Sequence, residues 1–113
     1  MSDAAAGSTI GPIIFADRTA RRQLRDYGTV VTFRKTSRTT GETWWRESRL
    51  GPKCGDVTVE EIGKVDPHIV SELEPYRELS GFSSVSAWQK AIIELNGGLP
   101  DTGYIYKVQS EGE

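Results

Sequence analysis

The segment that most constrains the fold is Thr-Val-Val-Thr-Phe-Arg-Lys, at residues 29–35. Its alternating pattern, rich in β-branched and aromatic side chains, is typical of a strand. Successive side chains of a strand point to opposite faces. One face would carry Val31 and Phe33, and the other Val30, Thr32 and Arg34. We therefore expect Val31 and Phe33 to enter a core, while a hydroxyl and a guanidinium share the other surface.

A helix is expected immediately before this strand, over residues 16–28. Asp17 is a suitable N-cap, and Gly28 is a suitable stop because glycine adopts the left-handed conformation at low cost. One face of this helix is apolar, and the other is basic. The basic residues are Arg18, Arg21, Arg22 and Arg25.

Further short strands and helices are expected along the chain. The strands are predicted at 13–15, 43–48, 56–65 and 103–108, with a hairpin tip at 40–42. One helix is predicted over 67–76, after Asp66 as a cap and with Pro67 at its first position. A second begins at Ser86, with Ser84 as the alternative start, and ends at Asn96. Its apolar stripe is expected to be packing surface: Trp88, Ala91, Ile92 and Leu95.

The strand at 56–65 contains a slip in its alternation. Val57 and Val59 are in phase, but Ile62 falls out of register after Glu60 and Glu61. A β-bulge explains such a slip, and bulges curve the strands of barrels. With several short strands and about three helices, the sequence predicts an α+β fold, a small and partly closed pseudo-barrel. We expect one domain at 10–109 between tails at 1–9 and 110–113.

Composition places the chain among soluble globular domains. Hydrophobic residues make up 36% and charged residues 27% of 113 residues, which suffices for one modest core. No apolar run approaches the length of a membrane span, and the N-terminus lacks the pattern of a signal peptide. We therefore expect a cytoplasmic protein that does not associate with membranes.

The sequence contains one cysteine, Cys54, and one histidine, His68. A single cysteine excludes an internal disulfide, which fits a reducing compartment. One cysteine and one histidine do not make a four-ligand zinc site, and no Ser/His/Asp spacing suggests nucleophilic catalysis. Neither a metal nor another cofactor is expected. Lys53 beside Cys54 favours the thiolate, although a small residue before a turn is the simpler interpretation.

The charges are distributed unevenly. Residues 1–53 carry ten lysines and arginines against five acidic residues, and residues 54–113 carry four against eleven. The basic residues crowd into positions 18–53. Such a patch attracts phosphate groups, although many charge clusters are only solvated faces.

The order of these elements resembles that of the ASCH domains, small relatives of the PUA domain. The resemblance covers about residues 13–109 and depends on four features. These are the Thr-Phe-Arg strand, Gly55-Asp56, the Ser-Gly-Phe-x-Ser-Val-x-x-Trp helix and the Gly-Tyr-Ile-Tyr-Lys-Val strand. It implies a PUA-like pseudo-barrel with a positively charged cleft that binds RNA or modified nucleosides.

Some bacterial members of that family remove the acetyl group from N4-acetylcytidine with a lysine, a threonine and a glutamate. When their Lys-Thr-Ile-Thr-Ile-Arg strand is matched at its arginine, Arg34, the threonine falls on Thr32. The lysine position falls on Thr29, and the glutamate position falls near Gly81. We therefore assign no catalytic residue, because amide hydrolysis needs an activated water and a general acid.

Three functions are compatible with the sequence. The first is a non-catalytic module that binds RNA or a nucleotide through Thr32, Arg34, Lys35, Arg38, Arg46 and Arg49. Arginine suits this role because its planar fork bonds phosphate oxygens and stacks on bases. The second is amide hydrolysis of an acetylated nucleoside. The third is a protein-interaction module that uses the acidic residues Glu60, Glu61, Glu72, Glu74 and Glu78.

Overall fold

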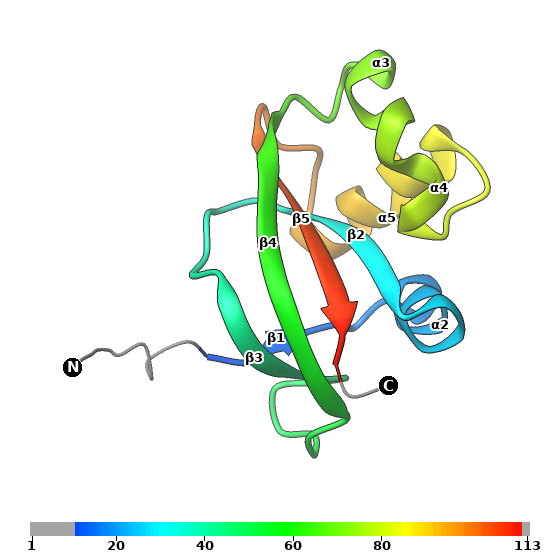
Figure 1. Cartoon of the computed structure of the whole chain (residues 1–113). Coiled ribbons are helices and arrows are strands. Elements are labelled where there is room, and N and C mark those ends of the chain that lie inside the picture. The colour runs from blue at the N-terminus through cyan, green and yellow to red at the C-terminus, as the bar shows by residue number, and fades with distance from the viewer. Residues whose placement is uncertain (1–10, 112–113) are drawn as a thin grey trace.

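A computed structural model describes residues 11–111 of the chain (Figure 1). Its five-stranded sheet has the order β1-β3-β4-β5-β2 and curls into a half-barrel. The strands are β1 (Ile13–Ile14), β2 (Thr29–Arg34), β3 (Gly41–Arg46), β4 (Gly55–Val65) and β5 (Gly103–Ser110). All neighbours are antiparallel except β1 and β3. The predicted α+β class and half-closed sheet are confirmed.

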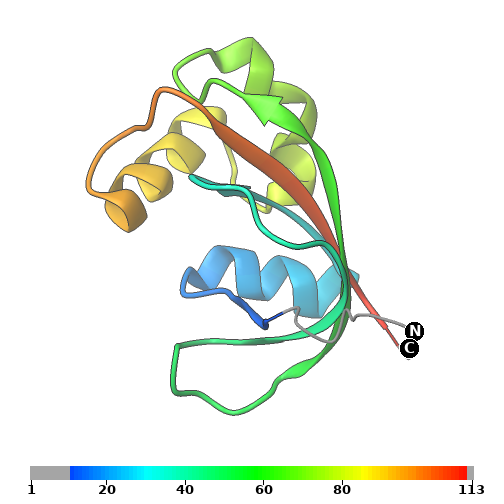
Figure 2. The same cartoon turned by 90° about the vertical axis from the view of Figure 1, so that its left-hand side faces the viewer.

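The helices lie in two groups on either side of β2 and β5 (Figure 2). On one side is α2 (Arg18–Tyr27). On the other is a helical run followed by α5 (Val85–Asn96). The run comprises α3 (Val70–Leu73), the 3-10 turn η2 (Glu74–Tyr76) and α4 (Arg77–Ser80). Within residues 11–111, no helix is long and apolar enough to span a membrane.

Two hydrophobic clusters fill the two sides. The first joins β1, α2 and the sheet, and contains Ile13, Phe15, Ala20, Leu24, Val30, Trp45, Val57, Val59, Tyr106 and Val108. The second lies under α3 to α5 and contains Val31, Phe33, Val65, Leu73, Val85, Trp88, Ile92 and Ile105. The predicted alternation of β2 is therefore confirmed, but Val30 is buried as well. The opposite face of β2 is only partly buried toward its end, at Thr32 and Arg34.

The predicted bulge in β4 is also confirmed. Glu61 lies opposite Tyr106, but Gly63, two residues later, lies opposite Ile105, the next residue back along β5. The extra residue, Ile62, reverses the phase of the strand. As a result, β4 contributes to the first cluster before the bulge and to the second cluster after it. One strand thereby closes both halves of the core.

The predicted caps of α2 are confirmed. The Asp17 side chain accepts hydrogen bonds from the backbone N–H groups of Thr19 (2.8 Å) and Ala20 (3.2 Å). Gly28 ends the helix with φ = 74°, a left-handed conformation that favours glycine. The tail predicted at 1–9 lies outside the described residues, and β5 continues to Ser110.

The first wrong prediction about the other elements concerns strand pairing. The expected hairpin tip at 40–42 is absent, because β3 pairs with β4 and β2 pairs with β5. The β2–β5 register sets Val30 against Val108 and Phe33 against Ile105. This match between apolar residues on both faces is a long-range preference that the local turn pattern does not reveal.

Three predictions about the helices are also wrong in detail. The segment after Asp66 first forms a turn, with His68 N donating to Asp66 Oδ1 at 2.9 Å, so α3 begins only at Val70. Ser84, not Ser86, caps α5 by accepting from Ala87 N at 3.0 Å. Leu95 is 59% exposed because it lies at the end of the stripe, beyond the second cluster.

Gly103 offers a test of the packing at the end of β5. A Cβ added there would overlap the Phe33 ring and lie 2.8 Å from the Arg34 carbonyl oxygen. We expect Gly103→Ala to lower the free energy of unfolding by about 1–3 kcal/mol, as overpacking of a core does. Gly63→Ala is the matched control, because its Cβ would contact no atom within 4 Å. Urea denaturation of both variants checks this, and equal midpoints would contradict it.

Candidate functional site

A cavity of about 250 Å³ lies at the free edge of β2, where the N-terminus of α2 approaches the C-terminus of α5. Three residues predicted as binding residues line it together: Thr32, Arg34 and Lys35. They come from the end of β2, opposite Tyr106 and Tyr104 in the neighbouring strand. The sequence-predicted hydroxyl and guanidinium therefore border one concavity.

The Arg34 side chain spans the opening of the half-barrel. Its Nη2 donates to the Ile14 carbonyl oxygen at 3.0 Å, which connects β2 to β1, the strand at the other edge of the sheet. The guanidinium carbon lies 5.1 Å from the centroid of the Phe15 ring. Within residues 11–111, the buried Nε has no hydrogen-bond partner. Arg34 is therefore fixed in place while part of its donor capacity is unused.

Burial lowers the pKa of Arg34 from its ordinary value to about 10, with a smaller contribution from the nearby positive charge of Arg38 and an opposing one from Tyr106. Because the pKa is lower in the folded chain, the charged guanidinium opposes folding at neutral pH. That penalty is relieved only as the pH rises above about 10. In the described part of the chain, no carboxylate forms an ion pair with Arg34. A buried cation without a counter-ion attracts anions.

Arg38 lies next to this cavity but does not line it. Its Nη2 donates to Gly11 O and its Nε donates to Thr39 O, each at 3.0 Å. Its backbone N–H donates to the Tyr106 hydroxyl at 2.8 Å. Burial lowers the pKa of Arg38, against a smaller opposing effect of Tyr106. The guanidinium therefore holds the loop after β2 against the segment that precedes β1.

The structure separates Arg46 and Arg49 from the cavity. Arg46 stacks on Trp44, with 5.1 Å between its guanidinium carbon and the ring centroid. Both point away from the face of β3 where Trp45 is buried, since side chains alternate. Arg49 is exposed in the connection between β3 and β4. The six predicted residues are thus one group of three, one neighbour and two separate positions.

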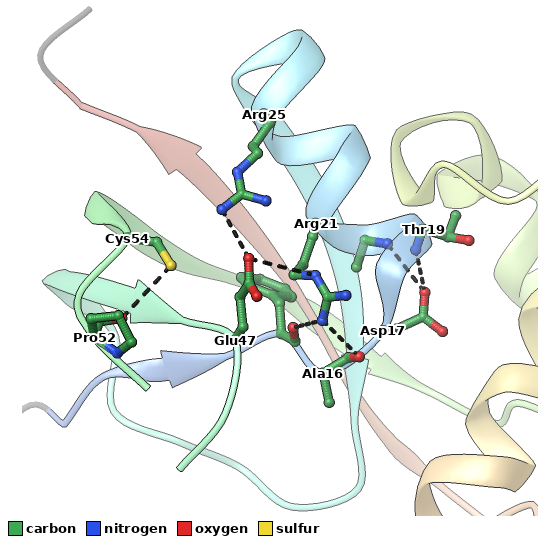
Figure 3. Close-up of polar contacts among 10 residues, drawn as sticks. Ala16, Asp17, Thr19, Arg21, Arg25, Glu47, Pro52 and Cys54 are labelled. Carbon is green, nitrogen blue, oxygen red and sulfur yellow. Dashed lines mark hydrogen bonds and ion pairs between the residues drawn. The ribbon is translucent and has the colours of Figure 1, made fainter. Parts of the chain in front are cut away.

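Much of the basic helix face serves the fold (Figure 3). Arg21 Nη1 donates to the carbonyl oxygens of Phe15 at 3.1 Å and Ala16 at 2.9 Å. Arg25 pairs with Glu47 at 2.9 Å and lies 4.9 Å from the Trp45 ring centroid. The predicted basic patch is therefore partly consumed by contacts within the protein.

Eight of the eleven residues that line the cavity were not predicted as site residues, and they include Asp17, Leu95 and Asn96. The sequence predicts Asp17 only as a helix cap and Leu95 only as packing surface. Asn96 Nδ2 donates to Ile92 O at 2.8 Å, and this hydrogen bond fixes the orientation of the Asn96 side-chain amide. No local signal in the sequence places the end of α5 beside β2, more than 60 residues earlier.

The acidic residues are also divided. Glu72 Oε1 accepts from Asp66 N at 2.7 Å, Glu61 lies 3.4 Å from the Tyr106 hydroxyl, and Glu74 lies 3.7 Å from Arg77. Glu60 and Glu78 are exposed. Three of the five predicted partner-binding carboxylates thus have partners in their own chain.

Metal-binding groups do not converge in residues 11–111, where no cluster of three or more His, Cys, Asp or Glu side chains occurs. Cys54 is exposed, and its Sγ lies 3.7 Å from Pro52 O (Figure 3).

Comparison with models of protein families, with curated proteins and with solved structures finds no match to this chain.

Mutation of Arg34 compares the contribution of its hydrogen bond with Ile14 to the cost of burying its charge. We expect Arg34→Met to leave the free energy of unfolding within about 1 kcal/mol of the original chain, because replacing a poorly compensated buried charge by an apolar side chain offsets the lost hydrogen bond. Urea denaturation in a buffer of low ionic strength measures this. A loss above about 2 kcal/mol would instead make the contact with Ile14 the main role of the residue.

Proposed function

We propose that the protein binds a nucleotide, alone or within RNA, in the cavity of Thr32, Arg34 and Lys35. The observation that carries this proposal is the Arg34 guanidinium, which has a buried Nε without a hydrogen-bond partner, lacks a carboxylate partner in residues 11–111 and borders a cavity. A phosphate or a base carbonyl would accept its unused hydrogen bonds, and arginine is suited to both. The resemblance to ASCH domains supports the same ligand class.

The size of the cavity favours one nucleotide over a duplex. About 250 Å³ lies slightly below the range of about 300–1,000 Å³ typical of sites for small molecules. A single phosphate or base fits such a volume, whereas a duplex is recognised over grooves and long backbone stretches. Phe15 and Leu95 provide apolar wall, while Thr32 and Lys35 provide a hydroxyl and a positive charge.

The binding proposal predicts a local effect of charge. Lys35→Ala should weaken binding of a nucleoside monophosphate by about two- to fivefold, the size of a partly exposed ion pair. Arg49→Ala removes an equal charge outside the cavity and should leave binding unchanged. Isothermal titration calorimetry at two salt concentrations measures both, and affinity should fall as salt rises. Equal effects of the two variants, or no binding at all, would contradict the proposal.

A second candidate is hydrolysis of an amide on a modified nucleoside, as in the family hydrolases. One observation favours it: Thr32, Lys35 and Asp17 line the same cavity and supply a hydroxyl, an ammonium and a carboxylate. The positions matched by sequence do not do so. Thr29 is at the opposite end of β2, and Gly81 borders the neighbouring cavities and not this one. In this reaction, water attacks the acetyl carbon, the C–N bond breaks, and the amine leaves with a proton.

This second function predicts that incubation with N4-acetylcytidine releases cytidine and acetate in equal amounts. Asp17→Asn should abolish turnover if the carboxylate acts as the base, yet it should preserve folding because asparagine is also a good N-cap. Chromatographic detection of free cytidine provides the measurement. Absence of product with the unmodified protein would exclude this candidate and leave the binding proposal intact.

A further inference from the structure

The Arg34 cavity is not isolated. A second cavity of about 460 Å³ adjoins it, and Asp17 borders both. Its walls are the first turns of α2, with Thr19 and Arg22, and the outer face of α5, with Lys90 and Glu94. Together the two cavities make one groove between α2 and α5, of which only the first part borders β2.

A glycine makes this groove possible. Gly81 ends α4 with φ = 88°, a conformation that favours glycine. A Cβ there would lie 2.9 Å from Gln23 Cβ and 3.3 Å from Thr19 O. Residues 81–83 can thus approach α2 closely and form the side wall that the second cavity shares with a third, of about 580 Å³.

The distribution of charges favours binding of an anionic strand in the first two cavities over binding in the third. The second contains Arg22 and Lys90, and within the described residues neither forms an ion pair. Its carboxylates are Glu94 and Asp17, and one oxygen of Asp17 already accepts two backbone hydrogen bonds. The third cavity adds Asp26 and Glu78. Its additional cation, Arg77, already donates to Phe82 O and lies near Glu74.

We propose that this groove binds a short single strand of RNA, with one nucleotide at Arg34 and the next ones along α2 toward Arg22. The inference rests on the proposed function of the Arg34 cavity and extends it. From Asp17 to Arg22, five residues of helix rise about 8 Å. At about 3.4 Å per stacked nucleotide, the two cavities accommodate about two to three nucleotides. Beyond them, Asp26 and Glu78 repel the next phosphate.

The experiment compares affinity for a ribonucleoside monophosphate and for single strands of two, three and six nucleotides. We expect affinity to rise at least about fivefold from the monophosphate to the trinucleotide and not to rise further for the hexanucleotide. A double variant, Arg22→Ala with Lys90→Ala, should remove this gain but keep the affinity for the monophosphate. A second double variant, Arg49→Ala with Lys64→Ala, is the matched control because it removes two exposed positive charges that border neither cavity, and circular dichroism checks the fold.

The outcomes separate the two proposals. Equal affinity for all lengths, or a gain that survives in the double variant, would overturn the groove while the nucleotide site stands. A continued rise up to the hexanucleotide would overturn its assigned length. Failure to bind any of the four ligands would overturn the nucleotide site itself, and the groove with it.

Discussion

The fold depends on β5 being buried on both faces between β4 and β2. Tyr106 and Val108 point into the first cluster, and Ile105 points into the second, all three with no exposed area. Because alternation separates the clusters, the strands on either side must match both faces at once. The bulge at Ile62 lets β4 do this along its length. At the free edge of β2, residues of α2 and α5 then border one cavity.

Arginine side chains replace the strand partner that β1 lacks. The carbonyl oxygens of Gly11, Ile14, Phe15 and Ala16 accept hydrogen bonds from Arg38, Arg34 and Arg21. Buried carbonyl groups need such partners, and the fork of the guanidinium reaches them from neighbouring elements. The basic first half of the chain therefore serves in part to attach the segment around β1, through Arg21, Arg34 and Arg38. Its charge count overstates the surface that is free to bind phosphate.

Arg34 makes one of these structural contacts and is also the residue on which the proposed binding site depends. Its hydrogen bond to Ile14 and its position over Phe15 restrict the guanidinium, while burial of the charge opposes folding. Sites that bind ligands commonly keep groups whose burial lowers stability. A bound anion would supply the missing compensation and would stabilise the folded chain by linkage.

Local signals alone determined the caps of α2, the two-sided alternation of 29–35 and the slip in β4, because each depends on neighbours within a few residues. They also singled out Thr32, Arg34 and Lys35. Only the tertiary structure decided that β2 pairs with β5, that Arg34 contacts Ile14, and that Asp17 and Leu95 border the same cavity. The physical reason is that strand pairing and helix docking depend on how whole faces fit together. A local pattern states which face a side chain occupies, but not which distant segment will cover it.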